Sequence, residues 1–131
     1  ALFKAIKSGI IDTIGSDHAP HTLEEKARPY GSCPSGVPGI ETTLPLLIEA
    51  YHQGLLSLKN IVDLTSRRAK EIFQLPDYAD DYVLVDLSLA RRVEEKQLKT
   101  KCQWSPFTGR LLRGWPVIIV LKNHVYDLAR L

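Results

Sequence analysis

The sequence has no methionine, no long apolar run and only two cysteines. A chain translated from its own start codon begins with methionine, whereas this one begins with Ala1. We therefore expect either a removed initiator or, as the favoured interpretation, a 131-residue segment of a longer polypeptide. No apolar run approaches the roughly 18 residues that span a bilayer, and no charged and apolar leader opens the chain. Neither a transmembrane helix nor a secretory signal is predicted.

An excess of charge of one sign is absent as well. The 17 basic and 15 acidic residues are mixed along the chain and leave a net charge of +2. Nucleic-acid-binding surfaces carry clustered basic residues. Here the densest basic pair, Arg91 and Arg92, is followed closely by Glu94 and Glu95. We expect no nucleic-acid partner and no membrane partner.

The composition is that of a globular protein, with 44% hydrophobic and 24% charged residues, which excludes a disordered or collagen-like chain. Cys33 and Cys102 lie far apart in the sequence, and their spacing leaves a disulfide open. We favour two free thiols in a reducing compartment, and hence a cytoplasmic location.

The first residues predict the αβ half of a parallel α/β unit. Apolar residues within 1–8 share one side of a helix, and Gly9 supplies its end. Residues 10–14 are mostly apolar and β-branched, which is typical of a buried strand in a parallel sheet. Catalytic side chains gather at the carboxyl ends of such strands, because the loops that leave there surround an open mouth.

Helical spacing predicts three further helices. The first ends at Gly54, the second follows an N-cap at Ser57, and the third covers residues 68–73. The second helix is expected to bury five side chains, those of Leu58, Ile61, Val62, Leu64 and Thr65.

A β-rich tail follows the helices, with the boundary near residues 76–81. Residues 82–87 and 117–121 have the composition of strands. Lys122 and Asn123 are expected to turn the second of these into a hairpin with residues 124–128.

Asp17, His18 and His21 lie within five residues, directly after the first predicted strand. A carboxylate there can bind a divalent metal or act as a general base, and histidines can bind a metal, move protons or donate hydrogen bonds to an anion. A structural interpretation has equal weight on spacing alone: the aspartate caps the turn while the histidines point to solvent.

The segment that follows, residues 22–39, is rich in glycine, proline and serine and is predicted to be a long loop. Loops of this length with little structure of their own are functional or disordered. Ser35, Gly36 and Gly39 lie in its glycine-dense end, where the backbone can approach a ligand closely or turn tightly.

This region strongly resembles the dihydroorotase family of the amidohydrolase superfamily, whose members are metal-dependent (β/α) barrels. The similarity covers nearly the whole chain and is carried by residues 17–26, 34–42, 44–47, 64–66, 69–76 and 104–109. It implies an α/β fold class in which residues 1–76 are the C-terminal part of a metal-dependent (β/α)8 TIM barrel. That part would hold the last strand, the following helices and a catalytic loop over residues 16–40. Residues 77–131 would be the β-rich tail of a small composite β-domain.

The resemblance also implies a reaction and its residues. Two metal ions, usually zinc, share a bridging hydroxide that attacks the ring amide of dihydroorotate, and the reverse reaction closes N-carbamoyl-L-aspartate into that ring. Asp17 matches the aspartate that contacts the metal and shuttles the proton. His21 matches the residue that holds the substrate carboxylate, and the backbone around Ser35 and Gly36 matches the loop that closes over the ring. His18 is interpreted as a residue that supports the site from behind its ligands or packs, and not as a ligand itself, because an extended backbone would point it away from Asp17.

Related cyclic amidases are separated from dihydroorotases by one position. Hydantoinases and allantoinases resemble dihydroorotases around the Asp-His pair, but the ring that they open lacks this carboxylate. They usually lack a histidine at the position of His21, so the motif Asp-His-Ala-Pro-His favours an acidic ring substrate.

The remaining polar and aromatic candidates are interpreted as structural. His52 and His124 are expected at the surface. Glu41 begins a helix, where a carboxylate suits the positive end of the dipole. Trp104 and Trp115 are expected to pack rather than to bind a ligand.

A complete (β/α)8 barrel takes about 250 residues, so most of the metal ligands implied by the resemblance would precede Ala1. We expect the segment alone to bind metal poorly, to be inactive, and to need the missing N-terminal part of its own chain as a partner. The short connection between Leu75 and Tyr82 resembles the animal multifunctional pyrimidine-synthesis polypeptide. Other expected partners are a second copy of the chain and aspartate transcarbamoylase. Two alternatives stay open: a non-catalytic scaffold that holds aspartate transcarbamoylase, and a cyclic amidase of the hydantoinase or allantoinase type.

Overall fold

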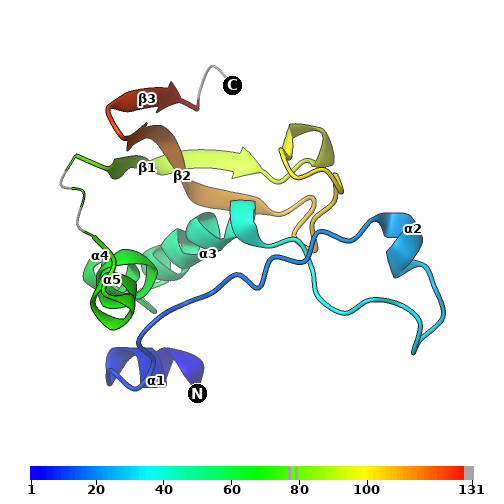
Figure 1. The fold of residues 1–131 in the computed structure, drawn as a ribbon, viewed down its shortest axis with the longest axis horizontal. Helices are drawn as coiled ribbons and strands as arrows, with labels where there is room; N and C mark the ends of the chain where they lie inside the picture. Colours follow the sequence, from blue (N-terminus) through cyan, green and yellow to red (C-terminus); the bar gives the residue numbers. More distant parts are fainter. Residues whose placement is uncertain (77, 79, 129–131) are drawn as a thin grey trace.

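A computed structural model describes residues 1–76, 78 and 80–128 of the chain (Figure 1). The helices are α1 (Leu2–Lys7), α2 (Leu23–Lys26), α3 (Ile40–His52), α4 (Leu58–Val62) and α5 (Arg68–Phe73), with a π-helical turn, Asp63–Arg67, between α4 and α5. The strands are β1 (Tyr82–Arg92), β2 (Leu111–Leu121) and β3 (His124–Asp127), and a 3-10 turn covers Glu95–Gln97. None of the helices in the described ranges has the length and apolar character that crossing a membrane requires.

The three strands form one antiparallel sheet in the order β1-β2-β3. Lys122 and Asn123 join β2 to β3, and both have positive φ angles, of 49° and 65°. Positive φ at both turn residues is the geometry of the two-residue hairpin turn that matches the twist of the flanking strands. The predicted hairpin is therefore confirmed, with β1 and β2 longer than the sequence indicated.

An irregularity interrupts the pairing of β1 with β2 between Asp86 and Ala90. The Asp86 carboxylate accepts hydrogen bonds from the backbone N–H groups of Ser88 (2.8 Å) and Leu89 (3.1 Å) and from the Ser88 hydroxyl (2.7 Å). These bonds lower the pKa of the Asp86 carboxyl, with the Ser88 side chain as the largest cause. Asp86 thus satisfies donors where the regular ladder is broken.

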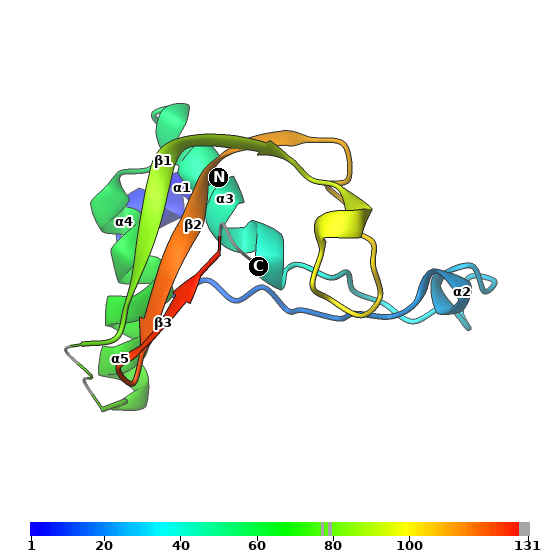
Figure 2. The ribbon, with the colours of Figure 1, turned by 90° about the horizontal axis from the view of Figure 1, so that it is seen from above.

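The core lies between α3 and the sheet (Figure 2). Ile48 of α3 is 3% exposed and packs with Ala50, Leu56 and Ile61, and residues of β1 cover this cluster. Gly114 of β2 faces Ile48 so closely that a Cβ there would lie 2.0 Å from the Ile48 Cγ2 atom. The helix can sit this deep on the sheet only because residue 114 has no side chain.

Serine and glycine signals placed the helices well. The Ser57 hydroxyl accepts from Asn60 N–H (3.1 Å) and caps α4, and α5 has the predicted bounds. The predicted burial on α4 was only partly right. Ile61 and Leu64 are buried, whereas Leu58 (39% exposed), Val62 (55%) and Thr65 are exposed. The expected domain boundary includes positions 77 and 79, which lie outside the described residues.

The predicted buried strand over residues 10–14 is wrong for this structure. The segment belongs to no helix and no sheet, and Ile10 is 75% exposed. Its links to the helical part are hydrogen bonds from Ile10 N–H to Ala5 O (2.9 Å) and from Ile14 N–H to Leu64 O (3.1 Å), and an ion pair of Asp12 with Arg68 (4.0 Å). A strand forms only beside another strand, and the described residues place none there.

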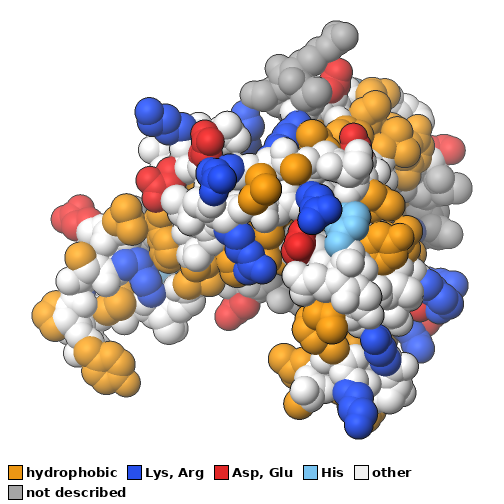
Figure 3. Space-filling model, turned by 180° about the vertical axis from the view of Figure 1, so that it is seen from behind, with side chains coloured by type: hydrophobic (Ala, Val, Ile, Leu, Met, Phe, Trp, Pro, Cys, Tyr) orange, Lys and Arg blue, Asp and Glu red, His pale blue; other side chains and the backbone are white. Residues whose placement is uncertain are grey.

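Two parts project from the body: α1 (Figure 1), and an arm that we define as residues 20–37, which carries α2 (Figures 1 and 2). Both carry exposed hydrophobic side chains (Figure 3). Leu2 on α1 is 73% exposed, and Tyr30 in the arm is fully exposed. The apolar face of α1 is thus only partly covered, since Ile6 packs against the core cluster.

Candidate functional site

Asp17 stands at the start of the site in an unusual backbone conformation. Its φ angle is +44°, in the left-handed region that non-glycine residues seldom adopt and that Asp tolerates better than most. Its side chain is exposed, and within the described residues no hydrogen bond or ion pair holds the carboxylate. Backbone strain of this kind concentrates at functional sites, where the surrounding structure maintains it.

His18 fastens the base of the arm. Its Nδ1 atom accepts hydrogen bonds from the backbone N–H groups of Gly39 (3.2 Å) and Ile40 (3.4 Å), and its backbone pairs with Val37. Because Nδ1 accepts, this ring is not available as a ligand through that atom. The structural interpretation of His18 is confirmed, although the expected reason was wrong, since Asp17 is not extended.

His21 lies in the arm directly before α2, and both its backbone and its ring have close neighbours. Trp104 Nε1 donates a hydrogen bond to His21 O (2.7 Å). The His21 Nδ1 atom lies 3.7 Å from Glu25 Oε2, with both side chains more than a third exposed. The ring therefore has a carboxylate on one side and an open edge, which suits a group that donates to an anion.

The capping box of α2 sets the position of Glu25. Thr22 N–H donates to Glu25 Oε2 (2.8 Å), and Glu25 N–H donates to the Thr22 hydroxyl (3.2 Å). The backbone hydrogen bond from Thr22 is the largest cause of the lowered pKa of the Glu25 carboxyl, and the charge of His21 adds to it. This helix was not expected, although Thr-x-x-Glu at 22–25 is a recognised start signal.

Ser35 and Gly36 lie where the arm returns to the body. Gly36 has a φ angle of +87°, and a Cβ there would lie 2.6 Å from Ala19 Cβ. Ala19 N–H donates to Val37 O (3.0 Å). Residues 36–37, where the arm returns to the body, thus lie against residues 18–19. This contact brings the predicted substrate loop beside the segment that carries Asp17. Ser35 itself is exposed and lines an open hollow of about 540 Å³ with Arg28, Tyr30, Gly31 and Cys33.

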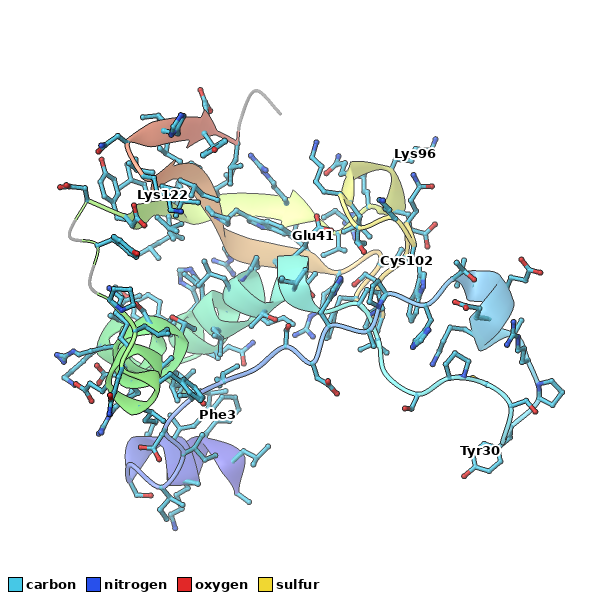
Figure 4. The ribbon with its side chains drawn as sticks, viewed as in Figure 1. Phe3, Tyr30, Glu41, Lys96, Cys102 and Lys122 are labelled. Atoms are coloured by element: carbon cyan, nitrogen blue, oxygen red, sulfur yellow. The ribbon has the colours of Figure 1, made fainter. Side chains whose placement is uncertain are left out.

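Residues 98–105 pack against the other side of the arm's base. The Glu41 carboxylate accepts from the backbone N–H groups of Lys99 (2.9 Å) and Thr100 (2.8 Å), so it clamps this segment to the start of α3 (Figure 4). Glu41 lies in the first turn of α3 and is structural, as predicted, but its bonds to residues 99 and 100 were not predicted. Trp104 does more than pack, because its indole reaches His21.

The two cysteines are free thiols, as expected, and Cys102 is buried. His52 and His124 are exposed, as expected. The His52 Nε2 atom lies 2.8 Å from Leu87 O, a contact that ties α3 to β1.

The donors of this site do not fit a two-metal centre by themselves. Within residues 1–76, 78 and 80–128, no group of three His, Cys, Asp or Glu side chains could hold a metal ion. Asp17 is one candidate ligand, and a metal centre needs ligands from several segments. The described residues therefore supply at most part of such a centre.

Comparison with known proteins shows which proteins this chain is similar to in sequence. No family model matches the chain. The dihydroorotase of Halobacterium salinarum is 42% identical over 134 residues, which cover 97% of this chain and 32% of the relative. The chain is homologous to part of a dihydroorotase. A multifunctional protein CAD of Squalus acanthias is 38% identical over 116 residues, covering 88% of the chain and 5% of that protein. A protein named dihydroorotase and a protein named multifunctional are thus both similar to this chain.

Solved structures place the fold in the amidohydrolase superfamily. The L-hydantoinase of Arthrobacter aurescens superposes with a TM-score of 0.87 at 27% identity over 96% of this chain and 31% of that enzyme. An inactive dihydroorotase-like domain of a Chaetomium thermophilum CAD-like protein superposes with a TM-score of 0.70 at 29% identity, over 95% of this chain and 34% of that domain. The predicted fold class, the C-terminal part of such a TIM-barrel enzyme, is confirmed. The chain spans about a third of the length of the dihydroorotase that it matches.

Proposed function

We propose that this chain is the part of a dihydroorotase that holds the substrate and moves the proton, in the reversible conversion of dihydroorotate to N-carbamoyl-L-aspartate during pyrimidine synthesis. The polypeptide in which it acts is longer, and the chain has residues 1–76 in the barrel and 77–131 in the small β-domain. A cytoplasmic location is part of the proposal and agrees with the two free thiols.

One observation carries the proposal. Asp17 and His21 lie on one short segment whose shape is fixed by contacts of other groups: the His18 ring, the Trp104 indole and the Gly36 backbone. Among the described residues, the Asp17 carboxylate has no hydrogen-bond partner, and the His21 ring has a carboxylate neighbour only at Nδ1. A fixed backbone with uncommitted side chains is what a catalytic segment requires.

Each candidate residue of the chain has its own role in the proposed reaction. The Asp17 carboxylate takes a proton from the attacking water and returns it to the ring nitrogen as the amide bond breaks. The His21 ring donates a hydrogen bond to the substrate carboxylate from the edge opposite Nδ1, which lies beside Glu25. The backbone at Ser35 and Gly36 lies over the ring of the bound dihydroorotate. Zinc dependence of the longer polypeptide belongs to the proposal, with Asp17 as this chain's ligand.

Substrate discrimination tests the proposal. The longer polypeptide is assayed with dihydroorotate and with hydantoin and dihydrouracil, which lack the carboxylate. We expect turnover of dihydroorotate, and we expect His21→Ala to lower kcat/KM for it while leaving the uncharged rings unaffected. Faster turnover of hydantoin than of dihydroorotate would contradict the assignment and favour the hydantoinase type. The 131-residue chain alone is expected to be inactive and to bind zinc poorly.

A second candidate is a non-catalytic scaffold, favoured by the similarity to the inactive dihydroorotase-like domain. On this alternative the longer polypeptide lacks turnover and holds aspartate transcarbamoylase. Co-sedimentation of the two proteins, together with the turnover assay, separates the candidates. A second copy of the chain is the further partner that we propose, and sedimentation of the longer polypeptide alone reports it.

A further inference from the structure

Lys26, the last residue of α2, reaches across the arm. Its Nζ atom donates hydrogen bonds to Pro34 O (2.7 Å) and Gly36 O (3.1 Å), eight and ten residues further along the chain. The two carbonyl groups flank Ser35. Hydrogen bonds from an ammonium group are stronger than those between neutral groups. Lys26 therefore closes residues 26–36 into a ring at the outer part of the arm.

Few other contacts hold this part of the arm. Within the described residues, the hydrogen bonds of segment 29–35 besides those of Lys26 are local. They run from the N–H groups of Ser32 and Cys33 to Pro29 O (both 3.0 Å) and from Cys33 Sγ to Pro34 O (3.5 Å). Tyr30, labelled in Figure 4, is fully exposed at the far end of the arm. Lys26 itself belongs to α2, and the capping box of Thr22 and Glu25 stabilises that helix.

The bond to Pro34 O also sets the direction of a donor. The peptide between Pro34 and Ser35 is trans, since the described chain has no cis bonds, and its C=O and N–H groups point in opposite directions. With Pro34 O held toward Lys26, the Ser35 N–H points away from α2. No group in the described part of the chain accepts a hydrogen bond from this N–H.

We infer that Lys26 is a positioning residue: it holds residues 34–36 so that the Ser35 N–H is presented to the acyclic or ring form of the substrate. The inference rests on the proposed function and adds to it a residue that does not touch the substrate. A free backbone N–H held at a fixed angle is a donor for a carbonyl or carboxylate oxygen.

The test uses K26M in the longer polypeptide, because methionine keeps the length of the side chain and removes the donors. The matched control is K59M, which removes a lysine that is 73% exposed and pairs with Asp63 on the following turn. K26R, which keeps the charge and the donors, is the rescue variant. KM and kcat for dihydroorotate are measured, together with the rate at which chymotrypsin cleaves after Tyr30 in the folded protein.

We expect K26M to raise KM about tenfold with kcat within about threefold of wild type, since the lost contacts act on binding. Cleavage after Tyr30 should be faster by about fivefold or more, because the arm opens more readily. K59M should match wild type in both measurements, and K26R should restore KM to within about threefold. If K26M does not fold, K26Q replaces it, with the same two readouts.

Wild-type KM in K26M overturns the inference, whether or not cleavage is faster. Wild-type cleavage in K26M overturns it as well. If the wild-type polypeptide does not turn over dihydroorotate at all, the proposed function fails. The cleavage rates of K26M and K59M then still decide whether Lys26 holds the arm.

Discussion

The indole Nε1 of Trp104 donates a hydrogen bond of 2.7 Å to the carbonyl oxygen of His21, which lies 83 residues earlier in the chain. The bond joins the segment before β2 to the arm that carries the substrate-binding candidate. Glu41 fastens the same segment to α3 through the N–H groups of Lys99 and Thr100. The position of His21 thus depends on the C-terminal half of the chain.

Trp104→Phe removes this donor and keeps most of the packing. A hydrogen bond contributes about 0.5–1.5 kcal/mol, so we expect KM for dihydroorotate in the longer polypeptide to rise about threefold to tenfold. Trp115→Phe is the control, because the Trp115 indole donates to Leu112 O within its own strand (2.9 Å). Steady-state kinetics of the two variants give the comparison. Equal KM values in both would show that the Trp104 bond does not position His21.

Asp17→Asn tests proton transfer. Asn tolerates the left-handed backbone of residue 17 as well as Asp does, so the fold should be retained. Loss of the carboxylate should lower kcat about 10²- to 10⁴-fold. Asp12→Asn, which changes an exposed carboxylate 4.0 Å from Arg68, should leave kcat unchanged. Activity of Asp17→Asn within a factor of about three of wild type would rule out the assigned role.

Gly36→Ala tests the close approach of the arm's return to residues 18–19. Gly31→Ala is the matched control, since Gly31 has a similar φ angle, +94° against +87°, and a Cβ at Gly31 would have no atom within 4 Å. The backbone cost of about 1 kcal/mol is then common to both variants. The contact with Ala19 should destabilise Gly36→Ala by about 1–3 kcal/mol more. Thermal unfolding of the two variants measures the difference, and equal melting temperatures would contradict the predicted clash.

The lowered pKa of the Asp86 carboxyl predicts a pH-dependent contribution to stability. The folded state binds this proton less readily than the unfolded state, so the carboxylate stabilises the fold above its ordinary pKa. That contribution is lost as the pH falls through the lower pKa of the folded state. The melting temperature of wild type should exceed that of Asp86→Asn at pH 7, and the difference should shrink below about pH 4. A difference that does not change between about pH 7 and pH 3 would contradict this role for the charge.

Local signals predicted the helices and the hairpin, because the residues that set these elements are neighbours in the chain. Ser57 caps α4 through Asn60, three residues on, and Lys122 and Asn123 turn β2 into β3. The family resemblance also placed the candidate site residues on one segment and its returning loop. The Thr22–Glu25 capping box was present in the sequence and could have predicted α2.

The features that the sequence could not predict depend on segments that are distant in the chain or absent from the described residues. Residues 10–14 have the composition of a strand, yet a strand exists only beside another one. The bonds of Lys26 to Pro34 and Gly36 and of Trp104 to His21 leave no periodic or spacing signal. The left-handed backbone of Asp17 likewise has no sequence signal, because Asp tolerates this conformation without requiring it.

The missing side chain at Gly114 has a consequence beyond the core. It lets Ile48 settle against β2, and so it fixes the height of α3 above the sheet. The first residue of that helix is Ile40, whose N–H is held by His18 at the root of the arm. A side chain added at position 114 would meet Ile48, so α3 would have to move away from β2. We expect such a movement to weaken the contact of Ile40 with His18, next to Asp17. Substitution of this core glycine is therefore expected to affect the site without changing any residue in it.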